Sequence, residues 1–267
     1  IERYRYGFYR RPLKPGGIML HSVSVGETLA AIPLVRALRH RYPDLPITVT
    51  TMTPTGSERV QSAFGPDVQH IYLPYDLPDA LNRFLNKVDP KLVLIMETEL
   101  WPNLLQCVAE YNIPQLLLNA RLSEKSAKGY AKFKRLTSPM LSQLSWIAAQ
   151  DQATLQRFAS LGQSTTSMSV VGNVKFDIAA PDWVAVQSEQ LYLDWQLTQR
   201  KVIVLASTHA PEEHQLLTEL KATLQADPSL LCIVVPRHPE RFDEVFQVAE
   251  QLGLNVKRRS LQQAVDA

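Results

Sequence analysis

The sequence predicts an α/β protein built on parallel sheets, and three observations support this fold class. Short apolar runs alternate with segments of helical periodicity along almost the whole chain. The runs are nearly continuous in Val, Ile and Leu, as expected when helices cover both faces of a parallel sheet. The order strand, helix, strand recurs, and right-handed crossovers would make such a sheet doubly wound.

The predicted elements fall into two series. The strands are predicted at 18–23, 47–52, 70–73, 92–96, 115–118, 146–149, 169–171, 202–206, 231–235 and 255–257. The helices are predicted at 28–42, 55–64, 77–87, 101–111, 151–161, 181–197, 211–226 and 239–252. We therefore expect an arm at 1–14, a Rossmann-like domain at 15–178, a connector at 179–200 and part of a second domain at 201–267.

Composition excludes several classes of protein. The 267 residues, 45% hydrophobic and 20% charged, suit two ordinary globular domains. A net charge of +2 gives no support for nucleic-acid binding. Cys107 and Cys232 are far apart and have no metal-type spacing, which fits a reducing compartment. No run approaches the roughly 18 apolar residues expected of a membrane span.

The first 14 residues mix cations with aromatic side chains. The cations are Arg3, Arg5, Arg10, Arg11 and Lys14, and the aromatic residues are Tyr4, Tyr6, Phe8 and Tyr9. This combination suits an anionic membrane surface, where each cation contributes about 1 kcal/mol. An ordinary solvated terminal arm explains the composition equally well.

Glu27 follows the first predicted strand at the start of a predicted helix. Ligands of open α/β sheets bind outside the carboxyl ends of the strands, so this carboxylate would face a ligand crevice. There it could remove a proton from a bound hydroxyl. Alternatively, it only stabilises the positive end of the helix, as first-turn acids do.

Other polar residues also follow predicted strands. In the first series they are Glu97, Glu99, Asn119, Arg121 and Lys175, and in the second Ser207, Thr208, His209, Arg237 and His238. Because the carboxyl ends of parallel strands share one edge, these groups could line a common cleft between the two units. Each residue also has a simpler explanation. Glu97 and Glu99 alternate as on a strand edge, so that only one of them would face the crevice. Asn119 could bond to backbone groups of a local turn, and Lys175 could be an exposed loop cation.

The second series contains the same strand–turn–helix pattern twice, in LASTHAPEEH and VPRHPER. In each, a strand leads through a polar turn to a proline that suits the first helical position, Pro211 and Pro239. Free N–H groups at such helix starts favour anions, and Arg237 would add a full charge. Plain capping with an exposed Arg237 is the alternative.

Several common motifs are absent from the sequence. It contains no G-x-G-x-x-G, no Walker P-loop, no D-x-D pair and no G-x-S-x-G elbow, and its six histidines have no metal-ligand spacing. Dinucleotide-binding, NTP-hydrolase, metal-diphosphate and serine-hydrolase functions therefore lose support.

Six segments together resemble the Kdo transferases. They are HSVSVGE (21–27), METELWPN (96–103), NARLS (119–123), GNVKFD (172–177), ASTHAPEE (206–213) and VPRHPER (235–241). These bacterial enzymes transfer 3-deoxy-D-manno-octulosonic acid (Kdo) from CMP-Kdo to a lipid A precursor in lipopolysaccharide biosynthesis. The resemblance implies the GT-B fold, two Rossmann-like domains with the active site in the cleft between them.

The resemblance implies roles for individual residues. Glu27 corresponds to the proton acceptor, Glu97 and Lys175 to transition-state stabilisers, and Pro236 and Arg237 to part of the CMP site. We expect inverting transfer to the 6′-hydroxyl of the precursor, with no metal or other cofactor. Further possible substrate-binding residues are Ser24, Gly26, Glu99, Asn119, Arg121, Ser207, Thr208 and His209.

The resemblance also implies partners and a location. The partners would be CMP-Kdo, the lipid A precursor and an anionic membrane surface, at the cytoplasmic face of the inner membrane; nucleic acid is not expected. The later M-G-E and N-P-L-E motifs of the CMP site do not occur in the sequence, so we expect an incomplete donor pocket. The protein would be either peripheral at the inner membrane or anchored by a hydrophobic N-terminal segment before residue 1. Another GT-B nucleotide-sugar transferase or epimerase, or a non-catalytic nucleotide-binding module, remains an alternative.

Overall fold

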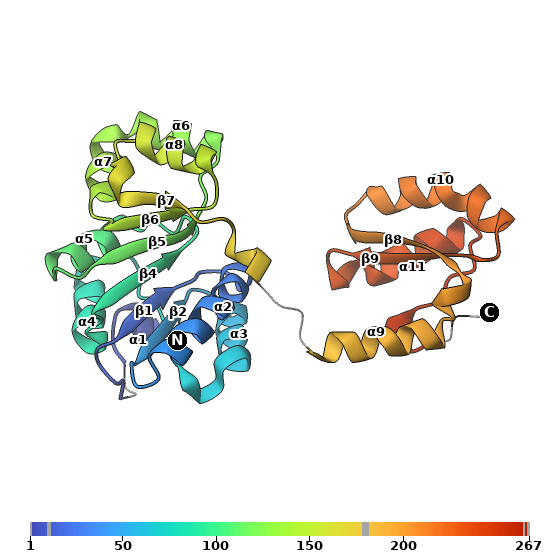
Figure 1. The fold of residues 1–267 in the computed structure, drawn as a ribbon, viewed down its shortest axis with the longest axis horizontal. Coiled ribbons are helices and arrows are strands. Elements are labelled where there is room, and N and C mark those ends of the chain that lie inside the picture. The colour runs from blue at the N-terminus through green and yellow to red at the C-terminus, as the bar shows by residue number, and fades with distance from the viewer. Residues whose placement is uncertain (1, 10–11, 178–181, 264, 266–267) are drawn as a thin grey trace. The chain divides into compact units, whose positions relative to one another are not determined.

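The computed structural model describes residues 2–9, 12–177, 182–263 and 265, and it divides into two compact units (Figure 1). Unit 1 comprises residues 1–179 and unit 2 residues 180–267. The predicted boundary at 178–179 lies outside the described residues, as do Arg10 and Arg11 of the predicted arm.

Unit 1 is built on a seven-stranded parallel sheet in the order β3-β2-β1-β4-β5-β6-β7. The strands are β1 (Ile18–His21), β2 (Ile47–Thr51), β3 (Gln69–Tyr72), β4 (Leu92–Met96), β5 (Gln115–Ala120), β6 (Trp146–Ala149) and β7 (Met168–Val170). The predicted α/β class with a parallel sheet is confirmed. The strand order reverses between β1 and β4, so the topological switch point lies at the carboxyl ends of these two strands.

Helices cover both faces of this sheet. They are α1 (Glu2–Arg5), α2 (Val25–Arg41), α3 (Pro54–Phe64), α4 (Pro78–Val88), α5 (Pro102–Glu110), α6 (Glu124–Lys132), α7 (Lys134–Ser142) and α8 (Gln152–Ser160). Neighbouring residues of one strand enter opposite cores: Met19 and Val93 pack with α4 and α5, whereas Leu20 and Leu94 pack with α2 and α3. Burial on both faces explains why these strands read as continuous apolar runs.

The helical periodicity did not predict α6 and α7. Helix α6 has no fully buried residue, and only Ala127 and Tyr130 pack partly against the core, so its apolar stripe is too weak for a periodicity to detect. Helix α7 contains Pro139 in its interior, a residue that normally argues against a helix.

The N-terminal segment packs on unit 1 through residues 2–9. The Arg5 guanidinium donates to the carbonyl oxygens of Met52 (2.6 Å) and Leu73 (3.1 Å) and lies over the Tyr72 ring. The Tyr9 hydroxyl donates to the Tyr72 carbonyl at 2.9 Å, and burial raises the pKa of Tyr9. Arg5 and Tyr9 are therefore structural residues of unit 1.

Unit 2 contains a two-stranded parallel sheet, β8 (Lys201–Thr208) and β9 (Leu230–Pro236), with helices α9 (Asp182–Asp194), α10 (Glu212–Ala226) and α11 (Phe242–Gln251). The strand predicted at 255–257 is wrong, because the described residues there are not in a strand. The Leu254 N–H donates to the Ala249 carbonyl of α11 instead, which ties the start of this segment to the helix end.

Within the described ranges, none of the helices combines the length and apolar character that a bilayer crossing requires.

Candidate active site

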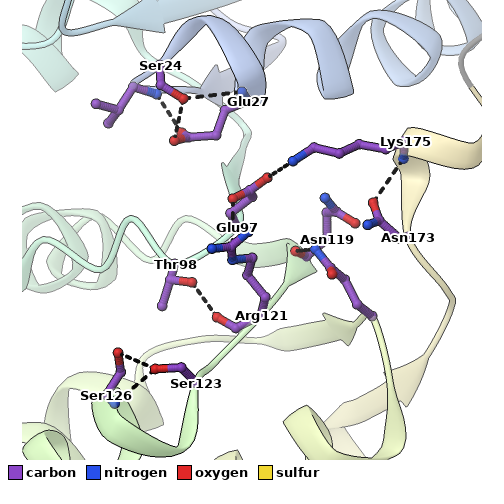
Figure 2. Close-up of polar contacts among 12 residues, drawn as sticks. Ser24, Glu27, Glu97, Thr98, Asn119, Arg121, Ser123, Ser126, Asn173 and Lys175 are labelled. Carbon is purple, nitrogen blue, oxygen red and sulfur yellow. Dashed lines mark hydrogen bonds and ion pairs between the residues drawn. The ribbon is translucent and has the colours of Figure 1, made fainter. Parts of the chain in front are cut away.

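Helix α2 starts immediately after β1, and Ser24 is its N-cap. The Ser24 Oγ accepts from the Glu27 N–H (3.3 Å) and donates to Glu27 Oε1 (2.9 Å), while Glu27 Oε2 accepts from the Val23 N–H (2.7 Å). Figure 2 shows this reciprocal capping arrangement. The helix begins three residues before the predicted start at 28. Glu27 therefore lies in its first turn and stabilises the helix start, the role considered above as the alternative to catalysis.

The environment of Glu27 also suits a base. Glu27 is only 7% exposed to solvent. Burial raises the pKa of Glu27, the hydrogen bonds from Val23 and Ser24 oppose this, and the charge of Glu97 adds to it. Each carboxylate oxygen uses one lone pair in the cap and keeps another for a substrate hydroxyl. Capping therefore orients the carboxylate and leaves lone pairs free to accept a proton, although the capping hydrogen bonds lower the pKa of Glu27.

Gly26 lies exposed in the first turn of α2. A β-carbon at Gly26 would meet only Ser24 Oγ, at 3.9 Å. Open space thus borders the helix start beside Glu27.

Glu97 lies across the switch point, one residue after β4. Its Oε1 pairs with Lys175 Nζ at 2.8 Å, and its Oε2 lies 3.8 Å from Arg121 Nε. Lys175 comes from the segment after β7 and Arg121 from the segment after β5, so three strand ends meet at this carboxylate (Figure 2). The structure thus brings Glu97, Lys175 and Arg121 together, as the shared sheet edge predicted.

Glu99 belongs to the same acidic group. Burial raises the pKa of Glu99, and the charges of Glu27 and Glu97 raise it further. Its Oε2 accepts from Trp101 Nε1 at 3.1 Å. The simple strand-edge alternation does not apply, because β4 ends at Met96 and Glu97 has a left-handed backbone (φ 56°).

Asn119 holds the Lys175 segment in place. It is 4% exposed, and its Oδ1 accepts from the Val174 N–H at 3.1 Å, 55 residues along the chain. The Asn173 Oδ1 then accepts from the Lys175 N–H at 3.0 Å. Asn119 therefore positions a loop from a distant strand, which differs from the local turn considered for it.

The sequence placed Thr98 among the polar residues that follow the strand at 92–96 but gave it no role; its hydroxyl donates to the Arg121 carbonyl (Figure 2). This bond joins the segments that follow β4 and β5. Thr98 lies between two acids that were singled out, but only the fold shows that its partner is 23 residues away.

The predicted polar residues of unit 2 also meet at strand ends. Thr208 of β8 pairs with Pro236 of β9, and the Arg237 N–H donates to the Thr208 carbonyl at 3.0 Å. His209 and His238 stack edge to face at 5.4 Å between ring centroids. Ser207, next to Thr208, is exposed like Arg237 and has a left-handed backbone (φ 58°).

The predicted helix starts of unit 2 need correction. Pro211 is the N-cap of α10 rather than its first residue, and Pro239 opens a short 3-10 turn that precedes α11. The Glu212 N–H, in the first turn of α10, donates to the His209 carbonyl at 2.7 Å. One donor that was expected for an anion is thus bonded within the chain. Arg237 is exposed, as its capping alternative expected.

Among the described residues, no group of three or more His, Cys, Asp or Glu side chains could hold a metal ion.

The fold resembles those of known nucleotide-sugar enzymes. The structure of UDP-GlcNAc 2-epimerase from Neisseria meningitidis matches with a TM-score of 0.62 at 14% identity, covering 89% of this chain and 69% of that one. A putative UDP-N-acetylglucosamine 2-epimerase from Listeria monocytogenes matches with the same TM-score at 13% identity, covering 92% and 68%. These likenesses show that the chain has a fold of the GT-B class.

Sequence comparison gives the family. A family model described as 3-deoxy-D-manno-octulosonic-acid transferase (kdotransferase) matches residues 2–178. The 3-deoxy-D-manno-octulosonic acid transferase of Haemophilus influenzae is 46% identical over 96% of this chain and 60% of its own length, and that of Bordetella pertussis is 36% identical over 91% and 57%. The chain belongs to the Kdo transferase family, and it spans about three fifths of the length of these relatives.

Proposed function

We propose that the protein containing this chain is an inverting glycosyltransferase that moves Kdo from CMP-Kdo to the 6′-hydroxyl of a lipid A precursor. One observation carries the proposal: a buried carboxylate with a raised pKa, Glu27, lies at the switch point of a doubly wound sheet. Family membership and the names of the relatives support the choice of Kdo as the transferred sugar.

Glu27 acts as the general base in this proposal. It removes the proton of the 6′-hydroxyl as that oxygen attacks the anomeric carbon of Kdo, and the bond from that carbon to the CMP phosphate breaks with its electron pair leaving on the phosphate. A raised pKa makes the Glu27 carboxylate a better proton acceptor than an ordinary glutamate. The cap formed with Ser24 fixes its direction before substrate binds.

Cationic groups offset the charge that develops. Lys175 is held by Glu97 at 2.8 Å, and its side chain is 41% exposed, so its ammonium can still face a substrate anion. In unit 2, Pro236 and Arg237 contact CMP, with Ser207, Thr208 and His209 beside them on the neighbouring strand end. Fixed charges of this kind stabilise a transition state because they need no reorganisation during the reaction.

The proposal includes a place of action. The acceptor is a lipid, so the protein works against an anionic membrane surface at the cytoplasmic face of the inner membrane. It requires no metal or other cofactor besides the donor substrate, and it does not act on nucleic acid.

Substitution of Glu27 by Gln tests the base directly. Gln keeps the size of the side chain and an acceptor oxygen for the cap, but it cannot take a proton at neutral pH. We expect kcat for Kdo transfer by the full-length protein to fall about 100-fold or more. Glu124→Gln, at the exposed first turn of α6, is the matched control and should leave kcat unchanged.

The outcomes separate the alternatives. Near-normal activity of Glu27→Gln would contradict the base assignment while leaving the family intact. Turnover of a UDP-sugar instead of CMP-Kdo by the wild-type protein would establish another GT-B transferase or epimerase. Nucleotide binding without turnover of either donor would indicate a non-catalytic module.

A further inference from the structure

Helices α6 and α7 form an unusually exposed and basic part of unit 1. Between residues 123 and 136 the sequence has five cations and one carboxylate. The single carboxylate, Glu124, pairs with Lys128 at 2.6 Å. Within the part of the chain that the structure describes, no ion-pair partner is found for the other four cations, Lys125, Lys132, Lys134 and Arg135.

Two large apolar side chains interrupt these cations. Phe133 joins the two helices and is 69% exposed, and Leu136 in the first turn of α7 is 64% exposed. We call Lys125, Lys132, Phe133, Lys134, Arg135 and Leu136 the α6–α7 surface. All six are exposed. The exposure of Phe133 and Leu136 is unusual, because burying an apolar side chain of this size is favourable by roughly 1.5–3 kcal/mol.

We propose that the α6–α7 surface binds the anionic headgroup layer of a lipid bilayer, with Phe133 and Leu136 inserted at the boundary of the acyl chains. The four unpaired cations complement the negative surface of such a layer. The two apolar side chains would move out of water into the boundary between headgroups and acyl chains, as the apolar faces of interfacial helices do. A purely electrostatic polyanion such as RNA would explain the cations but would gain little from Leu136.

The N-terminal segment is less suited to this role. Its Arg5 is already bonded to backbone carbonyls of unit 1, and its Phe8 ring lies 4.6 Å from the Arg83 guanidinium carbon. The cations of the α6–α7 surface have no such partners among the described residues. Arg5 and Phe8 are therefore less available to a bilayer than the α6–α7 surface, and the membrane contact expected from the first 14 residues stays a prediction.

The N-terminal end of helix α6 lies beside the candidate active site. Helix α6 begins at Glu124, three residues after Arg121, and Ser123 and Ser126 lie below Arg121 in Figure 2. Burial and, as a smaller cause, the charge of Glu99 raise the pKa of Tyr130 of α6. This step rests on the proposed function: a lipid acceptor could keep its acyl chains in the bilayer while its hydroxyl reaches Glu27.

Vesicle flotation with the 267-residue chain tests the proposal. The probes are vesicles of phosphatidylglycerol and phosphatidylcholine, with pure phosphatidylcholine vesicles for comparison. We expect binding only to the anionic vesicles, falling as salt rises. Changing Lys125, Lys132, Lys134 and Arg135 to Gln should weaken binding by about fivefold per cation. Phe133→Ser with Leu136→Ser should weaken it at every salt concentration.

A matched control has the same change of charge elsewhere on unit 1. The control residues are exposed cations of α2, α3 and α4, namely Arg36, Arg41, Arg59 and Lys87. Changing these four to Gln lowers the net charge by the same amount, but the affinity for vesicles should stay within about twofold of the wild-type value. The proposal is overturned if this control weakens binding as much as the α6–α7 variant. It is also overturned if the wild-type chain does not bind anionic vesicles, or if single-stranded RNA competes fully and the Phe133 and Leu136 changes have no effect.

The same variants distinguish this proposal from the proposed function. In the full-length protein, the α6–α7 variants should retain Kdo transfer to an acceptor dispersed in neutral detergent, since none of the six residues belongs to the candidate active site. Loss of vesicle binding with retained transfer supports the surface. Absence of transfer by the wild-type protein contradicts the proposed function without affecting the vesicle result.

Discussion

The two units contain similar apolar strand sequences but bury them to very different extents. Every residue of β1 and β2 is buried, whereas Thr208 alone is buried among the eight residues of β8. Val93 of β4 is 0% exposed and Val204 of β8 is 55% exposed. β4 lies between two neighbouring strands, but β8 pairs only with β9 in the described structure. A Val- and Ile-rich run thus predicts a strand, while its burial depends on how many elements pack around it.

The same difference extends to the strand-end residues. In unit 1, Glu27, Glu97 and Asn119 are buried or nearly so, and each is bonded to a segment that follows another strand or to its own helix start. In unit 2, Arg237 and His209 are exposed. Unit 1 therefore presents a preorganised group of side chains, and this contrast yields four predictions.

The largest effect is expected from the residue that positions the Lys175 segment. Asn119→Gly tolerates the left-handed backbone at this position (φ 52°) but removes the acceptor of the Val174 N–H. Because Lys175 would lose its fixed position opposite Glu97, we expect kcat for Kdo transfer to fall by about 10- to 100-fold with little change in KM.

Asn119→Asp is the control for this experiment, because it keeps an oxygen at the position of Oδ1. It should retain most of kcat if the bond to Val174 is what matters. Equal losses in the two variants would show instead that the amide nitrogen of Asn119 is required, and that the residue does more than hold the loop.

A second prediction compares the two sheets with one substitution. Val93→Ala removes two methyl groups from a fully buried site and should destabilise unit 1 by about 2 kcal/mol. Val204→Ala makes the same change at an exposed site and should cost no more than about 0.5 kcal/mol. Hydrogen exchange, measured separately in peptides from β4 and β8, gives both values. Similar costs would mean that β8 is covered in solution.

Much of unit 1 could be predicted from the sequence, because its signals are local. The seven strands are found close to their predicted places, and the shared sheet edge correctly brought Glu97 near Lys175. The Ser24 cap of α2 was not predicted, although Ser24 and Glu27 have the spacing of a capping box; only a stabilising role of Glu27 at the helix start was considered.

The errors have physical causes of their own. Helix α6 was missed because only Ala127 and Tyr130 pack partly against the core, and the strand at 255–257 was predicted from three residues that make no sheet in the described structure. The bond between Asn119 and Val174 could not be predicted, because it joins segments 55 residues apart and depends on the strand order. Local patterns identify elements, but they do not reveal which long-range partner each polar group finds.

A third prediction concerns pH. Burial lowers the pKa of His21 in unit 1 to about 4, whereas the histidines of α10 and of the unit 2 strand ends are exposed. Between pH 6.5 and about 4 the unfolded chain binds a proton at His21 that the folded chain does not bind. The free energy of unfolding of unit 1 should therefore fall with decreasing pH, by up to about 1.4 kcal/mol per pH unit from this residue.

His21→Asn tests this pH dependence against His214→Asn, an exposed site in unit 2. The His21 variant should lose part of the slope in this pH window when unit 1 is unfolded in urea at several pH values. The His214 variant should keep the slope of the wild type. An unchanged slope in both variants would assign the acid sensitivity to other groups, of which His70, with its pKa also lowered to about 4 by burial, is the first to examine.

The smallest effect compares two serine N-caps within unit 1. Ser24→Ala and Ser123→Ala each remove a side chain that accepts a backbone N–H at a helix start, at a cost of about 1 kcal/mol each. Ser24 alone also donates to Glu27, and that bond lowers the pKa of Glu27. A base must be deprotonated to act, so the fall in kcat towards acid pH should begin at higher pH in Ser24→Ala and stay unchanged in Ser123→Ala. If both variants keep the wild-type profile while losing similar stability, then the Ser24 hydroxyl only caps the helix and does not set the pKa that governs the reaction.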